Sequence, residues 1–356
     1  MRAMGMWMSR RCLAAGMIAA VAAAAAVAPW LFGAAHAQSV ADFYARNGLT
    51  LIVGSGAGGG FDAYARLFAR YFGRYLPGSP NIVVKNMPGA TGLVAMNSLY
   101  NAAPRDGSTI LASFNTVVLS ALYGDTNAKF DARQFGWIGS IGKQTGTCMT
   151  WRDTPVKTIE DARAQEVIVG ATGYGSTPVT FPKLLNAMLD TKFKIVAGYS
   201  TPGLRLAVER GEIQGICGLA WETIMSTTPY WVNDSKVNFL LQLGLKESPH
   251  LRGVPLAIDL IENPDDRQVF ELLGITQEFG RPLLAPPGLP AERLNALQTA
   301  FEATMADQDY LADAAKANQF VDPLSAKEID DLIDRAYAAP KDIVTRAAVY
   351  GAANEN

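Results

Sequence analysis

Three short segments rich in glycine and small hydroxyl residues carry the clearest chemical signal in this sequence. They span residues 54–62, 170–178 and 198–203, and each follows an apolar, strand-like run and precedes a helix-like segment. Glycine lets a ligand approach the backbone, and the amides at a helix N-terminus offer hydrogen-bond donors and partial positive charge to an anion. The pattern predicts three loops that bind an anionic ligand with neutral groups.

The first loop contributes the candidate ligand-binding residues Gly59, Gly60, Phe61 and Asp62. Asp62 falls in the first turn of the following helix, where helix-dipole complementarity or capping explains an acidic residue as well as ligand contact does. Phe61 belongs to a set of aromatic residues that either line a pocket or pack in the core: Phe61, Phe114, Tyr174, Tyr199 and Trp221.

The second and third loops add seven polar or aromatic candidates that can face the same ligand. They are Thr172, Tyr174, Ser176 and Thr177, then Tyr199, Ser200 and Thr201. Capping of the next helix is the alternative role for Ser176 and Thr177. Because open α/β sheets bind ligands at the carboxyl ends of their strands, the three loops together favour one shared site.

A nicotinamide-binding loop is the competing interpretation of the first segment. Gly54, Gly56 and Gly59 satisfy the G-x-G-x-x-G spacing between a strand and a helix. The acid expected about 20 residues further on, at the end of the second strand, is absent, because 83–86 reads Val-Val-Lys-Asn. We therefore expect no cofactor.

The N-terminus predicts export. Arg2, Arg10 and Arg11 precede an apolar stretch over 13–32, and Ala35-His36-Ala37 forms a small-x-small cleavage signal before Gln38. We expect a signal peptide over 1–37, cleaved after Ala37, and a periplasmic location; an uncleaved membrane anchor is the alternative. The adjacent arginines also fit a twin-arginine signal, so the export route stays open.

Length and charge restrict the remaining chain. Removal of the leader from the 356 residues leaves 319, enough for two domains, with 28 basic and 33 acidic residues and a formal charge of −5. A net negative charge does not indicate a nucleic-acid-binding protein, which typically carries an excess of basic residues. Cys148 and Cys217 lie in strand-like runs, where either a disulfide or two buried thiols is compatible with the sequence.

Catalysis finds little support, since only one histidine, His250, follows the leader. One histidine cannot build a histidine-rich metal site, and the 248–251 segment reads as a surface loop. We predict that the chain is not an enzyme. Two alternatives remain: an exported hydrolase that uses Ser176 or Ser55 with His250, and a ligand sensor for a signalling partner.

A strand-loop-helix pattern positions the candidate loops. It begins at Leu49 and starts again near Gly146, which is typical of mostly parallel sheets with helices on their faces. The last helical stretches, 325–337 and 341–350, are expected to return to the first lobe. The predicted organisation is therefore a discontinuous lobe 1 over 38–146 and 255–356 and a lobe 2 over 147–254.

Ordered motifs resemble the Bug family, the TctC-like receptors of tripartite tricarboxylate transporters. They are Gly58-Gly59-Gly60-Phe61-Asp62, then Asn86-Met87-Pro88-Gly89-Ala90-Thr91-Gly92, then Arg105-Asp106-Gly107-Ser108-Thr109. The resemblance runs from about Leu49 to the C-terminal helices. It departs from the family where 196–200 reads Val-Ala-Gly-Tyr-Ser.

The resemblance implies a two-lobed, type II-like periplasmic-binding-protein (Venus-flytrap) fold that closes on a small organic carboxylate. It adds Asn115 and Thr116, after the third strand, to the ligand-binding candidates. It also implies delivery to membrane transporter subunits. A di- or tricarboxylate and an aromatic acid are both candidate ligands, and we expect a monomer.

Overall fold

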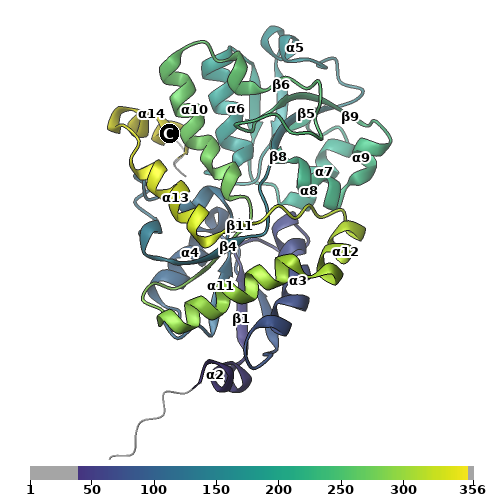
Figure 1. Ribbon diagram of the computed structural model, residues 1–356. Helices are drawn as coiled ribbons and strands as arrows, with labels where there is room; N and C mark the ends of the chain where they lie inside the picture. The colour runs from purple at the N-terminus through teal and green to yellow at the C-terminus, as the bar shows by residue number, and fades with distance from the viewer. Residues whose placement is uncertain (1–38, 352–356) are drawn as a thin grey trace, which may run out of the picture. The chain divides into compact units, whose positions relative to one another are not determined.

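The computed structural model describes residues 39–351, which form an α/β structure built on two sheets (Figure 1). The predicted leader, 1–37, lies outside the described residues. Within 39–351 no helix combines the length and the apolar character that crossing a membrane requires.

The first sheet has six strands in the order β11-β4-β10-β3-β1-β2. β1, β2, β3 and β4 run in one direction, and β10 and β11 run in the other. The strands are β1 Leu49–Val53, β2 Ile82–Asn86, β3 Thr109–Ala112, β4 Gly136–Ser140, β10 Pro282–Ala285 and β11 Leu324–Ser325. The C-terminal third of the chain therefore supplies two strands to this sheet.

The second sheet has five strands in the order β7-β6-β8-β5-β9. β5 alone among them runs against the others. The strands are β5 Gly146–Trp151, β6 Val167–Gly170, β7 Phe193–Val196, β8 Gly215–Ala220 and β9 Val237–Gln242. Two mixed sheets of mostly parallel strands confirm the predicted fold class, whereas the lobe boundaries stay a prediction.

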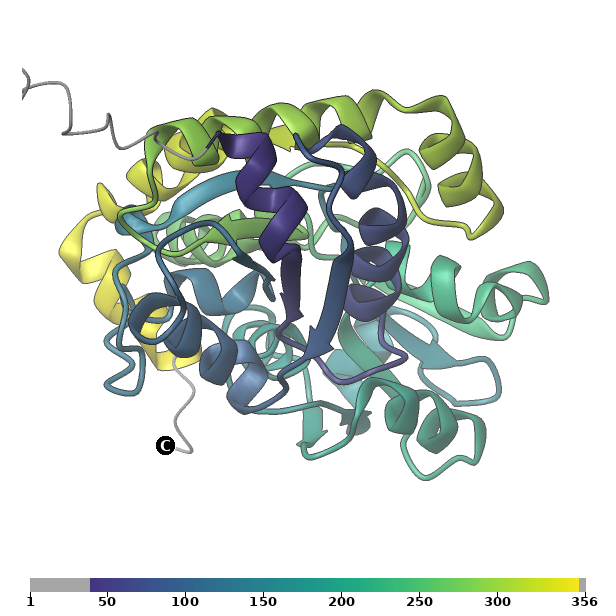
Figure 2. The same cartoon turned by 90° about the horizontal axis from the view of Figure 1, so that it is seen from below.

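Helices cover both sheets. Around the first sheet lie α2 Val40–Asn47, α3 Gly60–Tyr75, α4 Leu93–Asn101, α11 Ala291–Ala306 and α12 Gln308–Lys316, with α2 beside α11 (Figure 2). With the second sheet go α5 Ile159–Ala164, α6 Thr177–Leu189, α7 Thr201–Glu209, α8 Trp221–Thr227 and α9 Pro229–Asn233. The group α10 Pro264–Phe279, α13 Ala326–Tyr337 and α14 Lys341–Gly351 packs together, and α14 also contacts α6 (Figure 1).

α3 shows why the helices form where they do. Its apolar residues recur every three or four positions, so Tyr64, Phe68 and Phe72 share one face and are fully buried. The rings of Phe68 and Phe72 lie 4.6 Å apart, and Phe68 also meets Phe301 of α11. The aromatic stripe fixes α3, and with it the glycine loop that precedes it, onto the first sheet.

Two adjacent chain segments, 140–145 and 277–281, connect the two sheets. The Ser140 hydroxyl donates to the Phe279 carbonyl at 2.5 Å and accepts from the Arg281 amide at 3.0 Å. The backbone amide of Gln144 donates to the backbone carbonyl of Gln277 at 2.9 Å. Gly280 has φ +55°, and a Cβ there would fall 1.8 Å from the Gly142 carbonyl, so only glycine permits this approach.

β4 and β9 are strands that the sequence pattern did not reveal. β4 reads Gly-Trp-Ile-Gly-Ser, with glycines that weaken any strand signal. Gly139 is needed there because a Cβ would meet the Phe301 ring at 2.3 Å, and its φ is +155°. Tertiary packing of α11, rather than local propensity, therefore selects this strand.

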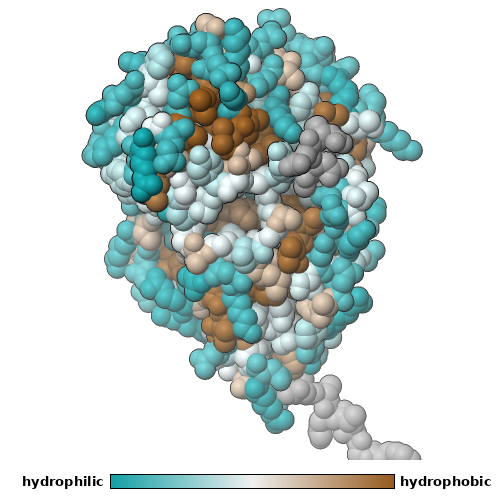
Figure 3. Space-filling view, turned by 180° about the vertical axis from the view of Figure 1, so that it is seen from behind, coloured by the Kyte–Doolittle hydropathy of each residue, from teal (hydrophilic) through white to brown (hydrophobic). Residues whose placement is uncertain are grey.

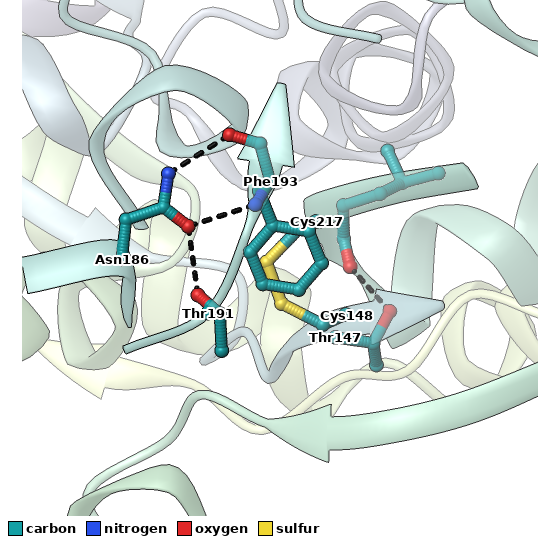
Figure 4. The surroundings of a disulfide bond; sticks show 7 residues. Thr147, Cys148, Asn186, Thr191, Phe193 and Cys217 are labelled. Atoms are coloured by element: carbon teal, nitrogen blue, oxygen red, sulfur yellow. Dashed lines mark hydrogen bonds between the residues drawn. A yellow bond between two sulfur atoms is a disulfide. The ribbon is translucent and has the colours of Figure 1, made fainter. Parts of the chain in front are cut away.

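Cys148 on β5 and Cys217 on β8 are joined by a disulfide (Figure 4). The two residues are cross-strand partners, and both are fully buried. Phe193 belongs to the same buried cluster, and the Asn186 side chain holds its backbone with hydrogen bonds of 2.8 and 2.9 Å. The bridge therefore crosses the middle of the second sheet.

The disulfide is expected to stabilise the fold by about 2–4 kcal/mol, because it restrains a chain segment of 69 residues in the unfolded state. The Cys148→Ala/Cys217→Ala variant should lose that amount in urea unfolding, and a reductant should destabilise only the parent protein. Free thiols at both positions in a non-reducing peptide map would contradict the pairing.

Candidate ligand-binding cleft

A cleft of two adjoining cavities lies among loops from both sheets. The larger cavity has a volume of about 500 Å³ and the smaller about 70 Å³. Both are lined by Gly60, Phe61, Thr91, Phe114, Thr172 and Thr201. The two cavities therefore form one continuous site.

Each loop of the cleft follows the carboxyl end of a strand. In the first sheet these loops are 54–61 after β1, 88–92 after β2 and 114–116 after β3. In the second sheet they are 172–178 after β6, 199–204 after β7 and the end of β8 itself. Strand direction therefore brings the loops of the two sheets to one site, as open α/β sheets generally do.

The structure brings twelve of the thirteen predicted ligand-binding residues to this cleft. The larger cavity is lined by Gly59, Gly60, Phe61, Thr172, Tyr174, Tyr199, Ser200 and Thr201. The smaller cavity is lined by Asn115, Thr116, Ser176 and Thr177, besides residues shared with the larger one. Asp62 lines neither cavity.

Several lining residues were not among the predicted candidates. The loop 88–92 contributes to the larger cavity, and Gln144, Gly218–Ala220 and Thr223 contribute to the smaller one. The Pro-Gly-Ala-x-Gly motif was a usable signal for 88–92, because its glycines permit unusual backbone angles. Gln144 and Thr223 have no local signal, since long-range packing alone places them there.

No described residue that lines either cavity carries a charged side chain. The lining consists of glycine, hydroxyl, amide, proline, aromatic and small aliphatic residues. Seen from behind, the surface is hollowed near its middle, and weakly polar or apolar residues border the hollow (Figure 3). Any charge on a ligand must therefore be met by neutral dipoles.

Two long helices present uncapped N-termini to the cleft. α3, of 16 residues, begins after Gly59, and α6, of 13 residues, begins after Ser176; neither N-cap makes a side-chain capping bond. The first-turn amides of a helix generally lack partners within the helix and carry the positive end of its dipole. In α6 this donor set is reduced, because Pro178 has no N–H and the Val179 amide donates to the Ser176 carbonyl at 2.9 Å. One such terminus comes from each sheet, and residues of both line the smaller cavity.

Three buried polar side-chain atoms at the cleft have no hydrogen-bond partner among the described residues. They are the Ser55 and Ser176 hydroxyls and the Gln144 Nε2 amide, on residues only 7%, 4% and 7% exposed. Buried polar groups in native proteins are almost always paired. These three atoms are therefore available to a bound ligand or to water.

Asp62 shapes the glycine loop instead of facing the cleft. Its carboxylate accepts from the Gly58 amide at 2.9 Å, from Arg66 Nε at 2.9 Å and from Asn86 Nδ2 at 2.8 Å. Asn86 also donates to the Ser55 carbonyl at 2.9 Å. Burial raises the pKa of Asp62, but the hydrogen bonds from Arg66, Gly58 and Asn86 outweigh burial and hold the pKa below its usual range.

A buried cation and a buried carboxyl group lie behind the cleft wall. The Arg281 guanidinium is 3.7 Å from the centre of the Tyr64 ring and 5.9 Å from that of Phe61. Glu222 accepts from the Thr145 amide at 3.0 Å. Burial raises the pKa of Glu222, and the positive charge of Arg281 offsets part of that rise. Neither charged group lines the cavities.

His250 is exposed, as predicted, and lines neither cavity. Its ring stacks on Trp221 at 6.0 Å and meets Phe320 at 4.8 Å. Trp221, an aromatic candidate for the pocket wall, is likewise absent from the lining of both cavities. Within 39–351 no cluster of three or more His, Cys, Asp or Glu residues is arranged to hold a metal ion.

Comparison with known proteins places the fold among periplasmic binding proteins. A TctC solute binding protein from Polaromonas aligns with a TM-score of 0.59 at 19% identity, over 84% of this chain and 98% of that one. The periplasmic binding protein BugD aligns with a TM-score of 0.64 at 17% identity, over 85% of this chain and 97% of that one. The structure of R. palustris Rpa4515 with adipate aligns with a TM-score of 0.65 at 17% identity, over 85% of this chain and 97% of that one.

Sequence comparison points in the same direction. No protein-family model matches the chain. A UPF0065 protein in the gbd 5′ region of Cupriavidus necator is 28% identical over 306 residues, which cover 84% of this chain and 87% of that protein. A UPF0065 protein of Bordetella bronchiseptica is 22% identical over 321 residues, 88% and 87% of the two chains. The chain is thus similar in sequence to UPF0065 proteins and in fold to the TctC and BugD structures, in line with the resemblance that its motifs predicted.

Replacement of Asp62 tests its structural role. Asp62→Asn should lower the free energy of unfolding at pH 7 by about 1–3 kcal/mol, because it removes a charge that accepts three hydrogen bonds. The pKa of Asp62 is lower in the folded protein than in the unfolded chain. The ionised carboxylate therefore stabilises the fold at pH values above the unfolded pKa, and this stabilisation is lost as the pH falls through the folded pKa. The deficit of the variant should therefore shrink below about pH 4.

Asp153→Asn is the matched control, because the Asp153 side chain is 75% exposed. It should change stability by less than about 0.5 kcal/mol at any pH. Urea unfolding between pH 3 and 8 measures both variants. Equal changes in the free energy of unfolding for the two variants would contradict the structural role of Asp62.

Proposed function

We propose that this protein is an exported solute-binding protein that captures a small organic carboxylate in the cleft and catalyses no reaction. The observation that carries the proposal is the pair of uncapped N-termini of α3 and α6, which face an uncharged cleft from opposite sheets. Helix N-termini favour anions over neutral and cationic groups.

Recognition of a carboxylate by such a cleft rests on replacement of its hydration shell. The unpartnered donors of Ser55, Ser176 and Gln144 supplement the first-turn amides of the helices. Hydrogen bonds to a charged group are stronger than those between neutral groups. Fixed donors therefore offset the desolvation of a carboxylate without a lysine or an arginine.

Location and partner follow from the same proposal. The N-terminal sequence has the features of a cleaved leader, which agrees with the periplasmic setting of the structurally similar binding proteins. Rpa4515, one of these similar structures, holds adipate, an organic diacid. In this proposal the loaded protein delivers its acid to membrane subunits of a tripartite tricarboxylate-type transporter and acts as a monomer.

The hydrolase alternative requires a base within hydrogen-bond reach of Ser55 or Ser176. The described residues that line the cavities include no histidine and no carboxylate, and His250 is stacked on Trp221 instead. The sensor alternative uses the same capture step with a different receiving partner. A pull-down with and without ligand separates that alternative from transport.

Ligand-induced stabilisation tests the proposal. An organic acid present at 100 times its dissociation constant should add about 2.7 kcal/mol to the free energy of unfolding and raise the melting temperature. The panel is aliphatic di- and tricarboxylates, aromatic carboxylates, the amides of the same acids, and NAD. Stabilisation by acids but not by their amides is the expected result.

Isothermal titration calorimetry then measures the affinity of each active acid. Equal effects of acids and amides would contradict the role of the helix N-termini. Stabilisation by NAD alone would contradict the whole assignment and favour the dinucleotide interpretation of the glycine loop.

A further inference from the structure

The two cavities of the cleft differ in chemistry. The smaller one is bordered by polar side chains, namely Asn115, Thr116, Gln144, Ser176, Thr177 and Thr223. Phe61 and Phe114 line both cavities, and the larger one adds the rings of Tyr174, Tyr199, Pro88 and Pro202 among glycine and hydroxyl residues. One end of the site therefore suits a polar head group and the other a ring-sized apolar body.

A fixed donor set makes the smaller cavity suitable for a carboxylate. The Gln144 Oε1 accepts from Asn115 Nδ2 at 3.2 Å, and Asn115 also donates to the Thr276 carbonyl at 2.7 Å. Asn115 thus orients the side-chain amide of Gln144, whose Nε2 atom has no hydrogen-bond partner. The unpartnered Ser176 hydroxyl lines the same cavity, at the N-terminus of α6.

The larger cavity offers volume and aromatic surface. At about 500 Å³ it falls within the range of about 300–1,000 Å³ that is typical of sites for drug-sized molecules. The Phe61 and Phe114 rings pack at 4.5 Å with a 58° tilt and form the wall between the two cavities. A short aliphatic acid would leave most of this apolar space to water, whereas an aromatic ring fills it.

We propose that the ligand is an aromatic carboxylate, with its carboxylate in the smaller cavity and its ring in the larger one. This assignment rests on the proposed function and narrows it. The unpartnered Ser55 hydroxyl lines the larger cavity and provides a donor for a polar substituent on the ring.

Calorimetry with matched probes tests the assignment. Benzoate and phenylacetate should bind at least about tenfold more tightly than succinate, adipate and citrate, because they bury more apolar area. Phenylacetamide, which lacks the charge, should bind more weakly than phenylacetate. Tighter binding of the aliphatic acids would overturn the aromatic assignment and leave the proposed function intact. Failure of every acid to bind would instead refute the proposed function itself.

Two variants separate the head from the body of the ligand. Ser176→Ala should weaken the binding of phenylacetate about tenfold or more and that of phenylacetamide much less, since it removes a donor to a charged group. Tyr199→Ala should weaken aromatic acids selectively. Tyr230→Ala is the matched control, because Tyr230 is 39% exposed and lies outside both cavities. Equal losses for acid and amide in Ser176→Ala would overturn the proposed orientation.

A second, independent observation concerns the rims of the cleft. The Thr91 hydroxyl, in the loop after β2, donates to the Tyr174 carbonyl, in the loop after β6, at 2.9 Å. A Cβ on Gly173 would lie 3.1 Å from the same hydroxyl. The loops of the two sheets are therefore in direct contact across the larger cavity.

The backbone around Thr91 is held in an unusual conformation. Ala90 and Thr91 have φ of +43° and +51°, a region that residues with a Cβ rarely adopt. Strained backbone of this kind persists where the surrounding structure requires it, often at ligand sites. Here the conformation directs the Thr91 hydroxyl to the opposite rim.

We infer that the Thr91 hydroxyl is a positioning group that holds the rims together and slows ligand escape. Thr91→Val, which keeps the branched shape, should increase the dissociation rate of a bound acid about fivefold, as expected for one neutral hydrogen bond. Thr91→Ser should retain the parent rate. Stopped-flow fluorescence measures both rates.

Small-angle scattering of the ligand-free protein gives a readout that does not depend on the identity of the acid. Thr91→Val should increase the radius of gyration, and Thr91→Ser should not. Identical dissociation rates, or identical scattering in the absence of a bound acid, for Thr91→Val and the parent protein would overturn the inference.

Discussion

The direction of the strands is the constraint on which this molecule depends. β1, β2 and β3 of the first sheet, and β6, β7 and β8 of the second, all end at the same cleft. A parallel strand must be followed by a connection that returns over the face of the sheet, so a helix usually begins where the strand ends. Helix N-termini gather at the cleft as a direct consequence.

The charged groups around the cleft shape it without entering it. Asp62 binds the glycine loop through Gly58 and joins it to Arg66 and Asn86. Arg281 lies against Tyr64, behind Phe61, and Glu222 holds the Thr145 amide of a connecting segment. Asp62 and Glu222 thus fix backbone amides, while neutral groups line the cleft.

The two segments that join the sheets, 140–145 and 277–281, pack closely against each other. Ser140, Gln144 and Gly280 connect them through short hydrogen bonds and a contact that only glycine permits. Gln144 belongs both to this connection and to the smaller cavity. Gln144 therefore connects the donor set of the smaller cavity to the segments that join the two sheets.

Much of the fold and most of the candidate site followed from local patterns. The spacing of Tyr64, Phe68 and Phe72 indicated α3, and the glycine and hydroxyl clusters after strand-like runs indicated the binding loops. Twelve predicted residues line the cleft because each lies in a loop that follows a strand. Local patterns indicated ten of them, and the family resemblance added Asn115 and Thr116. Asp62 was assigned to the ligand site as a candidate, yet its partners, Gly58, Arg66 and Asn86, occupy it fully.

Other features depend on contacts between distant segments and left no local trace. β4 forms from a glycine-rich run because Phe301 of α11 covers Gly139, and Gln144 reaches the cleft through Gln277 and Asn115. The sequence by itself determined the helices, most strands and the chemical character of the loops, because those depend on neighbours a few residues apart. Tertiary structure alone decided which loops meet, which polar atoms remain unpartnered and how the site divides into two cavities, because those depend on residues that only folding brings together.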